Sequence, residues 1–281
     1  MIRFDRILIP GSEFFSMTKS LLSINNLSVV ARSSTEVVQA VKGACLEIGE
    51  GEIVGLIGES GSGKTTLIRS ILDLHERNVQ VVSGSMIFKD IECYNFENAV
   101  NTLPIMRGKN IGMVFQSPRA SLNPLMTIGS QLREVLKKHC PELGREEIRS
   151  RVIRVLEEMG LDSERVSRSY PHQLSGGMCQ RASIAIAIVI QPELIVTDEC
   201  TSALDVTSQA EVVNVLKKLT ISHQTAMLFV THDILLASEL CHRLIVMQHG
   251  VIVEGGETSE VLANPTHPYT RGLISAVPRW G

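Results

Sequence analysis

The stretch that decides the fold of this chain is Gly58, Glu59, Ser60, Gly61, Ser62, Gly63, Lys64, Thr65 and Thr66. It follows an apolar run at 53–57 and leads into a helix-like run at 67–72. A strand, a glycine loop and a helix in this order form the context of a phosphate-binding P-loop. The glycines let backbone N–H groups turn around an anion, and the helix start adds free N–H donors. We therefore expect this stretch to bind the phosphates of a nucleoside triphosphate.

Two side chains of the loop have expected roles of their own. Lys64 would reach the β- and γ-phosphates, and the Thr65 hydroxyl would bind Mg²⁺. The alternative is a glycine-rich turn that only joins a strand to a helix. The apolar run on one side and the helical pattern on the other favour the P-loop.

A pair of carboxylates follows a second apolar strand. The run at 194–197 leads directly into Asp198 and Glu199. In P-loop enzymes the first acid at such a strand end holds Mg²⁺, and a following glutamate polarises water for in-line attack. Because acidic pairs at strand ends are common, this pair indicates nucleotide hydrolysis only in combination with the P-loop.

Composition excludes several classes of protein. The chain has 281 residues, of which 44% are hydrophobic, with a net charge of −3 and an isoelectric point near 6.3. A nucleic-acid partner is not expected, because phosphate-backbone binding needs a basic face. No run approaches the roughly 18 apolar residues that cross a bilayer, so any membrane connection is expected to run through another chain. The six cysteines contain no C-x-x-C pair and predict neither a disulfide scaffold nor a zinc site.

The periodicity along the chain predicts an α/β fold. Alternating residues at 21–57 indicate short antiparallel strands, and helical character begins at Pro118. Helix 209–219 between apolar strands 194–197 and 226–231 predicts a βαβ crossover. Further expected elements are strands 83–88 and 111–115, helices 146–159 and 177–190, and a hairpin of strands 244–247 and 251–254. The predicted architecture is a P-loop core with an antiparallel β subdomain and an inserted helical subdomain at about 117–180.

A second candidate anion site precedes the helix expected at 177–190. It comprises Leu174, Ser175, Gly176, Gly177 and Met178, followed by Cys179 and Gln180. A hydroxyl and bare amides at a helix start suit a phosphate, but one triphosphate does not need two such sites. Two chains arranged head to tail would use both. The alternative is a helix N-cap followed by glycines that allow close packing.

With these motifs in this order, the chain from Leu21 onward resembles the nucleotide-binding subunit of an ABC transporter. The resemblance identifies 174–180 as the signature motif, Gln116 as the Q-loop glutamine and His232 as the switch histidine. It identifies the D-loop as Ser202, Ala203, Leu204 and Asp205. It implies an ATPase with catalytic residues Lys64, Gln116, Glu199 and His232. It also implies Mg²⁺ held by Thr65, Gln116 and Asp198.

Residues 117–124 and 264–271, together with Met178, resemble the peptide/nickel import subfamily. This implies that the chain powers import of oligopeptides, dipeptides, nickel or metal chelates. The implied partners are a second, non-identical ATPase subunit, two membrane permease subunits and an extracytoplasmic substrate-binding protein. The implied location is the cytoplasmic face of the bacterial inner membrane. The expected domains are an arm or mis-assigned start at 1–20, an ATPase domain at 21–265 and a short subfamily tail at 266–281.

Two departures from the family pattern keep alternatives open. Cys200 stands where the family commonly has proline after the catalytic glutamate, and no aromatic residue lies near 29–31 to stack on adenine. Val38 and its neighbours are the alternative support for the base. The rival functions are a soluble, non-transport ABC ATPase and a regulatory subunit with impaired turnover. Long coiled-coil arms, zinc modules or a second cassette would favour the former, and the chain has room for none.

Overall fold

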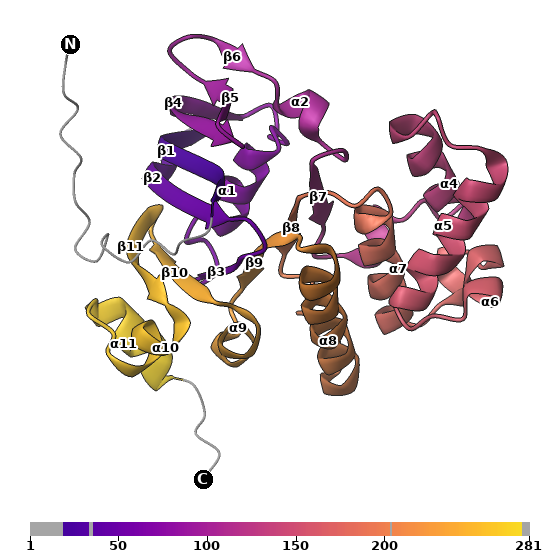
Figure 1. Cartoon of the computed structure of the whole chain (residues 1–281). Helices are drawn as coiled ribbons and strands as arrows, with labels where there is room; N and C mark the ends of the chain where they lie inside the picture. The colour runs from indigo at the N-terminus through magenta and orange to yellow at the C-terminus, as the bar shows by residue number, and fades with distance from the viewer. Residues whose placement is uncertain (1–18, 34–35, 203, 277–281) are drawn as a thin grey trace.

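A computed structural model describes residues 19–33, 36–202 and 204–276 of the chain. The arm expected at 1–20 therefore lies almost wholly outside the described residues, as do Ala203 and the last five residues of the expected tail. The predicted fold class is confirmed: an α/β core carries an antiparallel sheet on one side and a group of helices on the other (Figure 1).

The central sheet has six strands in the order β11-β10-β3-β9-β8-β7. All neighbours are parallel except β10 and β11, which form the predicted antiparallel hairpin. The bounds are β3 Ile53–Ile57, β7 Ile111–Val114, β8 Leu194–Asp198, β9 Ala226–Thr231, β10 Arg243–Gln248 and β11 Val251–Glu257. Strands β3, β8 and β9 are buried along their whole length, which explains their continuous apolar sequences.

The second sheet is antiparallel, in the order β2-β1-β4-β5-β6. Its strands are β1 Ser20–Arg32, β2 Val37–Gly49, β4 Val79–Phe88, β5 Ile91–Asn95 and β6 Val100–Asn101. The first two strands are each 13 residues long, so the prediction of several short strands in this region was wrong. The reason is that β1 shifts register against β2 at several points, for example between Ile24 and Leu27. Each shift changes the phase of the alternation and imitates a strand end.

A group of helices projects from the central sheet (Figure 1). It contains α3 Pro118–Ser121, α4 Ile128–His139, α5 Arg145–Glu158, α6 Ser163–Arg168, the 3₁₀ turn η1 Pro171–Gln173 and α7 Gly176–Ile188. The stripe predicted on α5 is buried through Ile148, Val152 and Leu156. Gly160, in a left-handed conformation with φ +64°, follows the helix end as predicted.

The remaining helices connect or flank the strands. They are α1 Lys64–Ile71, α2 Leu103–Met106, α8 Val206–His223, α9 Ile234–Leu240, α10 Thr258–Ala263 and α11 Pro268–Ser275. Helix α8 joins the adjacent parallel strands β8 and β9, as the predicted crossover requires. None of the helices within the described residues is long and apolar enough to span a bilayer.

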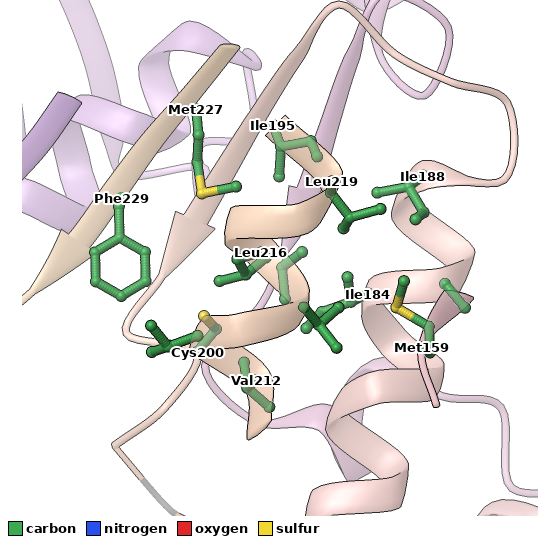
Figure 2. Packing of buried hydrophobic residues seen from close by; sticks show 14 of the residues in the cluster. Met159, Ile184, Ile188, Ile195, Cys200, Val212, Leu216, Leu219, Met227 and Phe229 are labelled. Carbon is green, nitrogen blue, oxygen red and sulfur yellow. The ribbon is translucent and has the colours of Figure 1, made fainter. Parts of the chain in front are cut away.

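The central sheet separates two apolar cores. Along β3, Ile53 and Ile57 face one core while Val54 and Leu56 face the other. Figure 2 shows the first core, where Leu216 of α8 is drawn between Phe229 of β9 and Ile184 of α7. Helices α7 and α8, whose starts carry the residues predicted as the signature motif and the D-loop, are thus fixed to the same sheet as the expected P-loop.

Candidate nucleotide site

The P-loop connects β3 to α1, and its shape depends on a close approach of two backbones. Gly63 precedes α1 with φ +105°, and a Cβ there would lie 2.4 Å from the carbonyl oxygen of Ala40. Only glycine fits this position. No described side chain caps α1, so its first N–H groups point to a place where an anion would be bound.

Lys64 is buried at the start of α1, with 4% of its surface exposed. Its Nζ donates hydrogen bonds to the carbonyl oxygens of Gly58, at 2.8 Å, and Glu59, at 2.9 Å. Nζ also lies 3.9 Å from Oε1 of Glu199. Burial lowers the pKa of Lys64, and the carboxylates of Glu199, Asp198 and Glu59 oppose that shift. The ammonium is thus held inside the loop beside acceptors.

Thr65 and Asp198 bring two oxygen ligands together. The Thr65 hydroxyl donates to Oδ1 of Asp198 at 3.0 Å, and Asp198 is buried at the end of β8. Burial raises the pKa of Asp198, and the hydrogen bond from Thr65 opposes the rise. The described residues contain no group of three or more His, Cys, Asp and Glu that could hold a metal ion. A hydroxyl and one carboxylate suit Mg²⁺, which typically completes its ligands with phosphates and water.

Glu199 is the meeting point of three elements. Its Oε2 accepts a hydrogen bond from Nε2 of Gln116, after β7, at 3.3 Å. Nδ1 of His232, after β9, lies 3.4 Å from the same oxygen. Three predicted catalytic side chains therefore converge although they are far apart in the sequence. The carboxyl ends of parallel neighbouring strands bring them to one edge of the sheet.

The turn that carries Glu199 is closed despite Cys200 in the place of proline. Glu199 has φ +44°, its N–H donates to the carbonyl of Val230 at 3.1 Å, and its carbonyl accepts from the amide and hydroxyl of Ser202. Cys200 itself belongs to the core shown in Figure 2, where burial raises the pKa of its thiol to about 12. The thiol is therefore neutral, and Ser202 provides the restraint on the turn.

A cavity of about 430 Å³ collects the P-loop residues Lys64, Thr65 and Thr66 with Gln116 and Glu199. Its other lining residues include Val38, Gln39, Ala40, Lys42 and His249. Val38 was considered in the sequence, but Lys42 and His249 were not. A larger groove of about 830 Å³, lined by Glu50, Gln191 and His223 among others, contains no predicted site residue. Its walls hold no P-loop amide, so we place the nucleotide chemistry in the smaller cavity.

The predicted signature residues, 174–178, lie at the start of α7 and do not line the smaller cavity. Ser175 caps the helix, since its Oγ accepts from the amide of Met178 at 3.3 Å. A Cβ on Gly177 would lie 2.8 Å from Oγ of Ser208 in α8. Asp205 of the predicted D-loop caps α8 by accepting from the amide of Ser208 at 3.0 Å, and this bond lowers the pKa of Asp205. Leu174 is buried, and Leu204 packs against the first core.

Two contacts of the P-loop have no signal in the local sequence. The amide of Gly250, in the β10–β11 turn, donates to the carbonyl of Ser62 at 2.9 Å. The hydroxyl of Tyr269, in α11, accepts from the amide of Glu59 at 2.9 Å. The sequence predicted the hairpin and identified 264–271 as a motif, but nothing in either segment indicates a contact with residues about 200 positions earlier.

Comparison with known proteins agrees with this geometry. Residues 41–202 match the family model for the ABC transporter, and residues 253–281 match the one for the oligopeptide/dipeptide transporter C-terminal region. The oligopeptide transport ATP-binding protein AppD of Bacillus subtilis is 40% identical over 261 residues, covering 92% of this chain and 79% of that protein. The oligopeptide transport ATP-binding protein OppD of Lactococcus lactis subsp. cremoris is 37% identical over 264 residues, covering 93% and 77%.

Among solved structures, the ATP-binding cassette MJ0796, a dimer in a post-hydrolysis state with ADP and Pi, matches with a TM-score of 0.73 and 30% identity. The match covers 85% of this chain and 99% of that one. The chain belongs to the ABC transporter family. Within that family it is an ATP-binding and ATP-hydrolysing subunit of the oligopeptide/dipeptide importer type.

Proposed function

We propose that this chain binds Mg·ATP in the cavity beside the P-loop and uses its hydrolysis to drive import of peptides across a membrane. The observation that carries the proposal is the convergence of Lys64, Gln116 and His232 on Glu199, next to the Thr65–Asp198 pair. The match of residues 253–281 to the transporter C-terminal region supports peptides as the substrate.

In this proposal the residues 58–66 hold the phosphates through backbone amides and through Lys64. Lys64 must then exchange its hydrogen bonds with the carbonyls of Gly58 and Glu59 for phosphate oxygens. Thr65, Asp198 and Gln116 would hold Mg²⁺, which neutralises charge that develops on the phosphates. The Thr65 hydroxyl would then turn its lone pairs, rather than its proton, to the ion.

Glu199 orients the water that attacks the γ-phosphate and accepts its proton. His232 and Gln116, which lie within 3.4 Å and 3.3 Å of the same carboxylate oxygen, set the direction of that oxygen. When phosphate enters, His232 is free to contact it. The carboxylate works best where bulk water is excluded, and the cavity in this chain is open.

A second ATPase subunit would close the cavity. Residues 174–178 form a helix start that offers amides and the Ser175 hydroxyl but line no part of this chain's own nucleotide cavity. We infer that they cover the nucleotide held by a partner, with D-loop residues Ser202, Ala203, Leu204 and Asp205 between the two. The related cassette MJ0796, which is dimeric, supports this arrangement. Subfamily resemblance favours a non-identical partner.

The wider assembly follows from the same resemblance. We propose two membrane permease subunits and an extracytoplasmic substrate-binding protein as partners, with this chain on the cytoplasmic face of the bacterial inner membrane. We also propose that 21–265 act as the ATPase domain, with the helical subdomain at about 117–180 and a tail at 266–281. The related proteins AppD and OppD, named for oligopeptide transport, support the permease and binding-protein partners.

The proposal is tested by uptake in cells that depend on this transporter. Cells with the intact chain are expected to accumulate a labelled oligopeptide, and cells with Lys64→Ala are not. Labelled Ni²⁺ offered in parallel separates a peptide importer from a nickel importer. Uptake of neither substrate, with ATP hydrolysis in a soluble fraction, would contradict the proposal in favour of a non-transport ATPase.

A further inference from the structure

The C-terminal helix reaches back to the P-loop through one hydrogen bond. The hydroxyl oxygen of Tyr269 accepts from the backbone N–H of Glu59 at 2.9 Å, although the two residues are 210 positions apart. The carbonyl of Glu59 accepts from Nζ of Lys64 at 2.9 Å. The backbone N–H and C=O of a single loop residue are thus held by Tyr269 on one side and by the phosphate-binding lysine on the other.

Tyr269 is itself fixed by its neighbours. His267 caps α11, because its Nδ1 accepts from the amide of Tyr269 at 3.2 Å, and Pro268 occupies the first helical position. Proline there is preset for a helix and lacks an N–H that would need a partner. The side chains of Tyr269, Leu273 and Ile274 then pack against the first core. The hydroxyl is therefore aimed by a helix that has both a cap and an apolar face.

Glu254 of β11 anchors the chain just before α11. Its Oε1 accepts from the amide of Thr266 at 2.6 Å and from the Thr266 hydroxyl at 2.8 Å. Its Oε2 accepts from the amide of His267 at 3.0 Å. Burial by itself would raise the pKa of Glu254, but the nearby Thr270 hydroxyl, together with these hydrogen bonds from Thr266 and His267, outweighs burial and lowers the pKa, so the charged form is favoured. The carboxylate connects the entry of α11 to β11, the edge strand of the central sheet.

We propose that Tyr269 is a positioning residue of the nucleotide site: it holds the P-loop in the conformation that accepts phosphate, and Glu254 holds Tyr269 in place. Tyr269 does not touch the nucleotide in this account. Without its hydroxyl the amide of Glu59 loses its partner, and the loop spends more time in conformations that do not bind phosphate. The apparent Kd for ATP equals the intrinsic Kd divided by the fraction of chains whose loop is in the phosphate-binding conformation, so it rises as that fraction falls.

The experiment is Mg·ATP binding by the purified full chain, measured by titration calorimetry, for the parent and Tyr269→Phe. This substitution removes one oxygen and keeps the ring in the core. We expect the Kd to rise about three- to tenfold, as for the loss of one hydrogen bond. Tyr94→Phe, at a half-buried tyrosine of β5 in the antiparallel sheet, is the matched control and should leave the Kd within about twofold.

Glu254→Gln provides a second, independent variant, because it weakens the anchor without touching Tyr269. It should also raise the Kd. The double variant should have about the same Kd as the single variant that binds ATP more weakly, since both substitutions act on one linkage. A purely structural role would lower the melting temperature of the nucleotide-free chain and leave the Kd unchanged. A parental Kd in Tyr269→Phe would overturn the proposal, as would fully additive effects in the double variant.

Discussion

Gly63 precedes α1 and Gly176 is the first residue of α7, and both helices offer N–H groups to an anion, yet their surroundings differ. At α1 the preceding Gly63 has no side chain, Lys64 is buried, and the side chains of Asp198 and Glu199 approach from β8 and its following turn. At α7 the Ser175 side chain caps the helix and Gly176 is exposed, with no atom within 4 Å of where its Cβ would stand.

This difference shows what one chain can do by itself. The α1 end holds a cation, acceptors and a carboxylate cluster, which are the parts of a hydrolysis site. The α7 end offers backbone amides and the Ser175 hydroxyl, and both Ser175 and Gly176 are exposed. It is suited to cover a phosphate that another molecule brings. The predictions that follow test this division, from the largest expected effect to the smallest.

The largest effect is expected at the carboxylate of the α1 end. In the assembled transporter, Glu199→Gln should lower ATP turnover by about 10²- to 10⁴-fold, because an amide cannot accept the proton from the attacking water. ATP binding should persist, since the amide fits the same space. Turnover and ATP Kd measured on one preparation separate the two effects.

The control is Glu239→Gln, which removes an exposed carboxylate on α9 that pairs with Lys217 at 2.8 Å. It should turn over ATP at the parental rate. Hydrolysis at the parental rate by Glu199→Gln would mean that another group activates the water.

At the α7 end the informative change is Gly176→Asp. A carboxylate at a helix start stabilises the helix, and the site has room for it, so the chain should fold with unchanged or higher stability. It should still lower turnover of the complex about tenfold or more. Like charges about 4 Å apart at an effective dielectric constant of about 20 repel by about 4 kcal/mol.

Gly144→Asp is the matched control, since Gly144 caps α5 and a Cβ there also meets nothing within 4 Å. It should leave turnover unchanged. If Gly176→Asp kept full turnover in the complex, the start of α7 would not be a phosphate-covering site.

The smallest effect is expected from a helix cap beside the cluster. Asp233 accepts from the amides of Leu235 and Leu236 at 2.9 and 3.1 Å, directly after His232. Asp233→Ala should cost about 1 kcal/mol of unfolding free energy and lower kcat a few-fold through the displaced histidine. Asp162→Ala removes the comparable cap of α6, and should cost about the same stability with no change in kcat. If kcat were equal in the two variants, the prediction that Asp233 acts on turnover through the position of His232 would be contradicted.

The sequence predicted best those elements whose structure depends on residues that are neighbours in the chain. Strand β9 was placed to the residue because a fully buried parallel strand is one apolar run between polar ends. Lys64 and Thr65 were singled out by the glycine loop, and the Asp198–Glu199 pair by the apolar strand before it, because both are local patterns. The lengths of β1 and β2 were missed because register shifts broke the alternation. The contacts of Ser62 with Gly250 and of Glu59 with Tyr269 depend on tertiary packing, which no window of sequence contains.

The central claim is that this chain holds two half-sites, each of which needs a partner. The most direct test is the specific ATPase activity of the isolated chain, shown to be monomeric by sedimentation at the assay concentration. That activity is then compared with the activity after co-expression with the sister ATPase and the membrane subunits. We predict weak activity in the monomer and at least about tenfold more in the complex, abolished there by Glu199→Gln. Full activity from a dilute monomer would contradict the account, because one chain would then complete its own site.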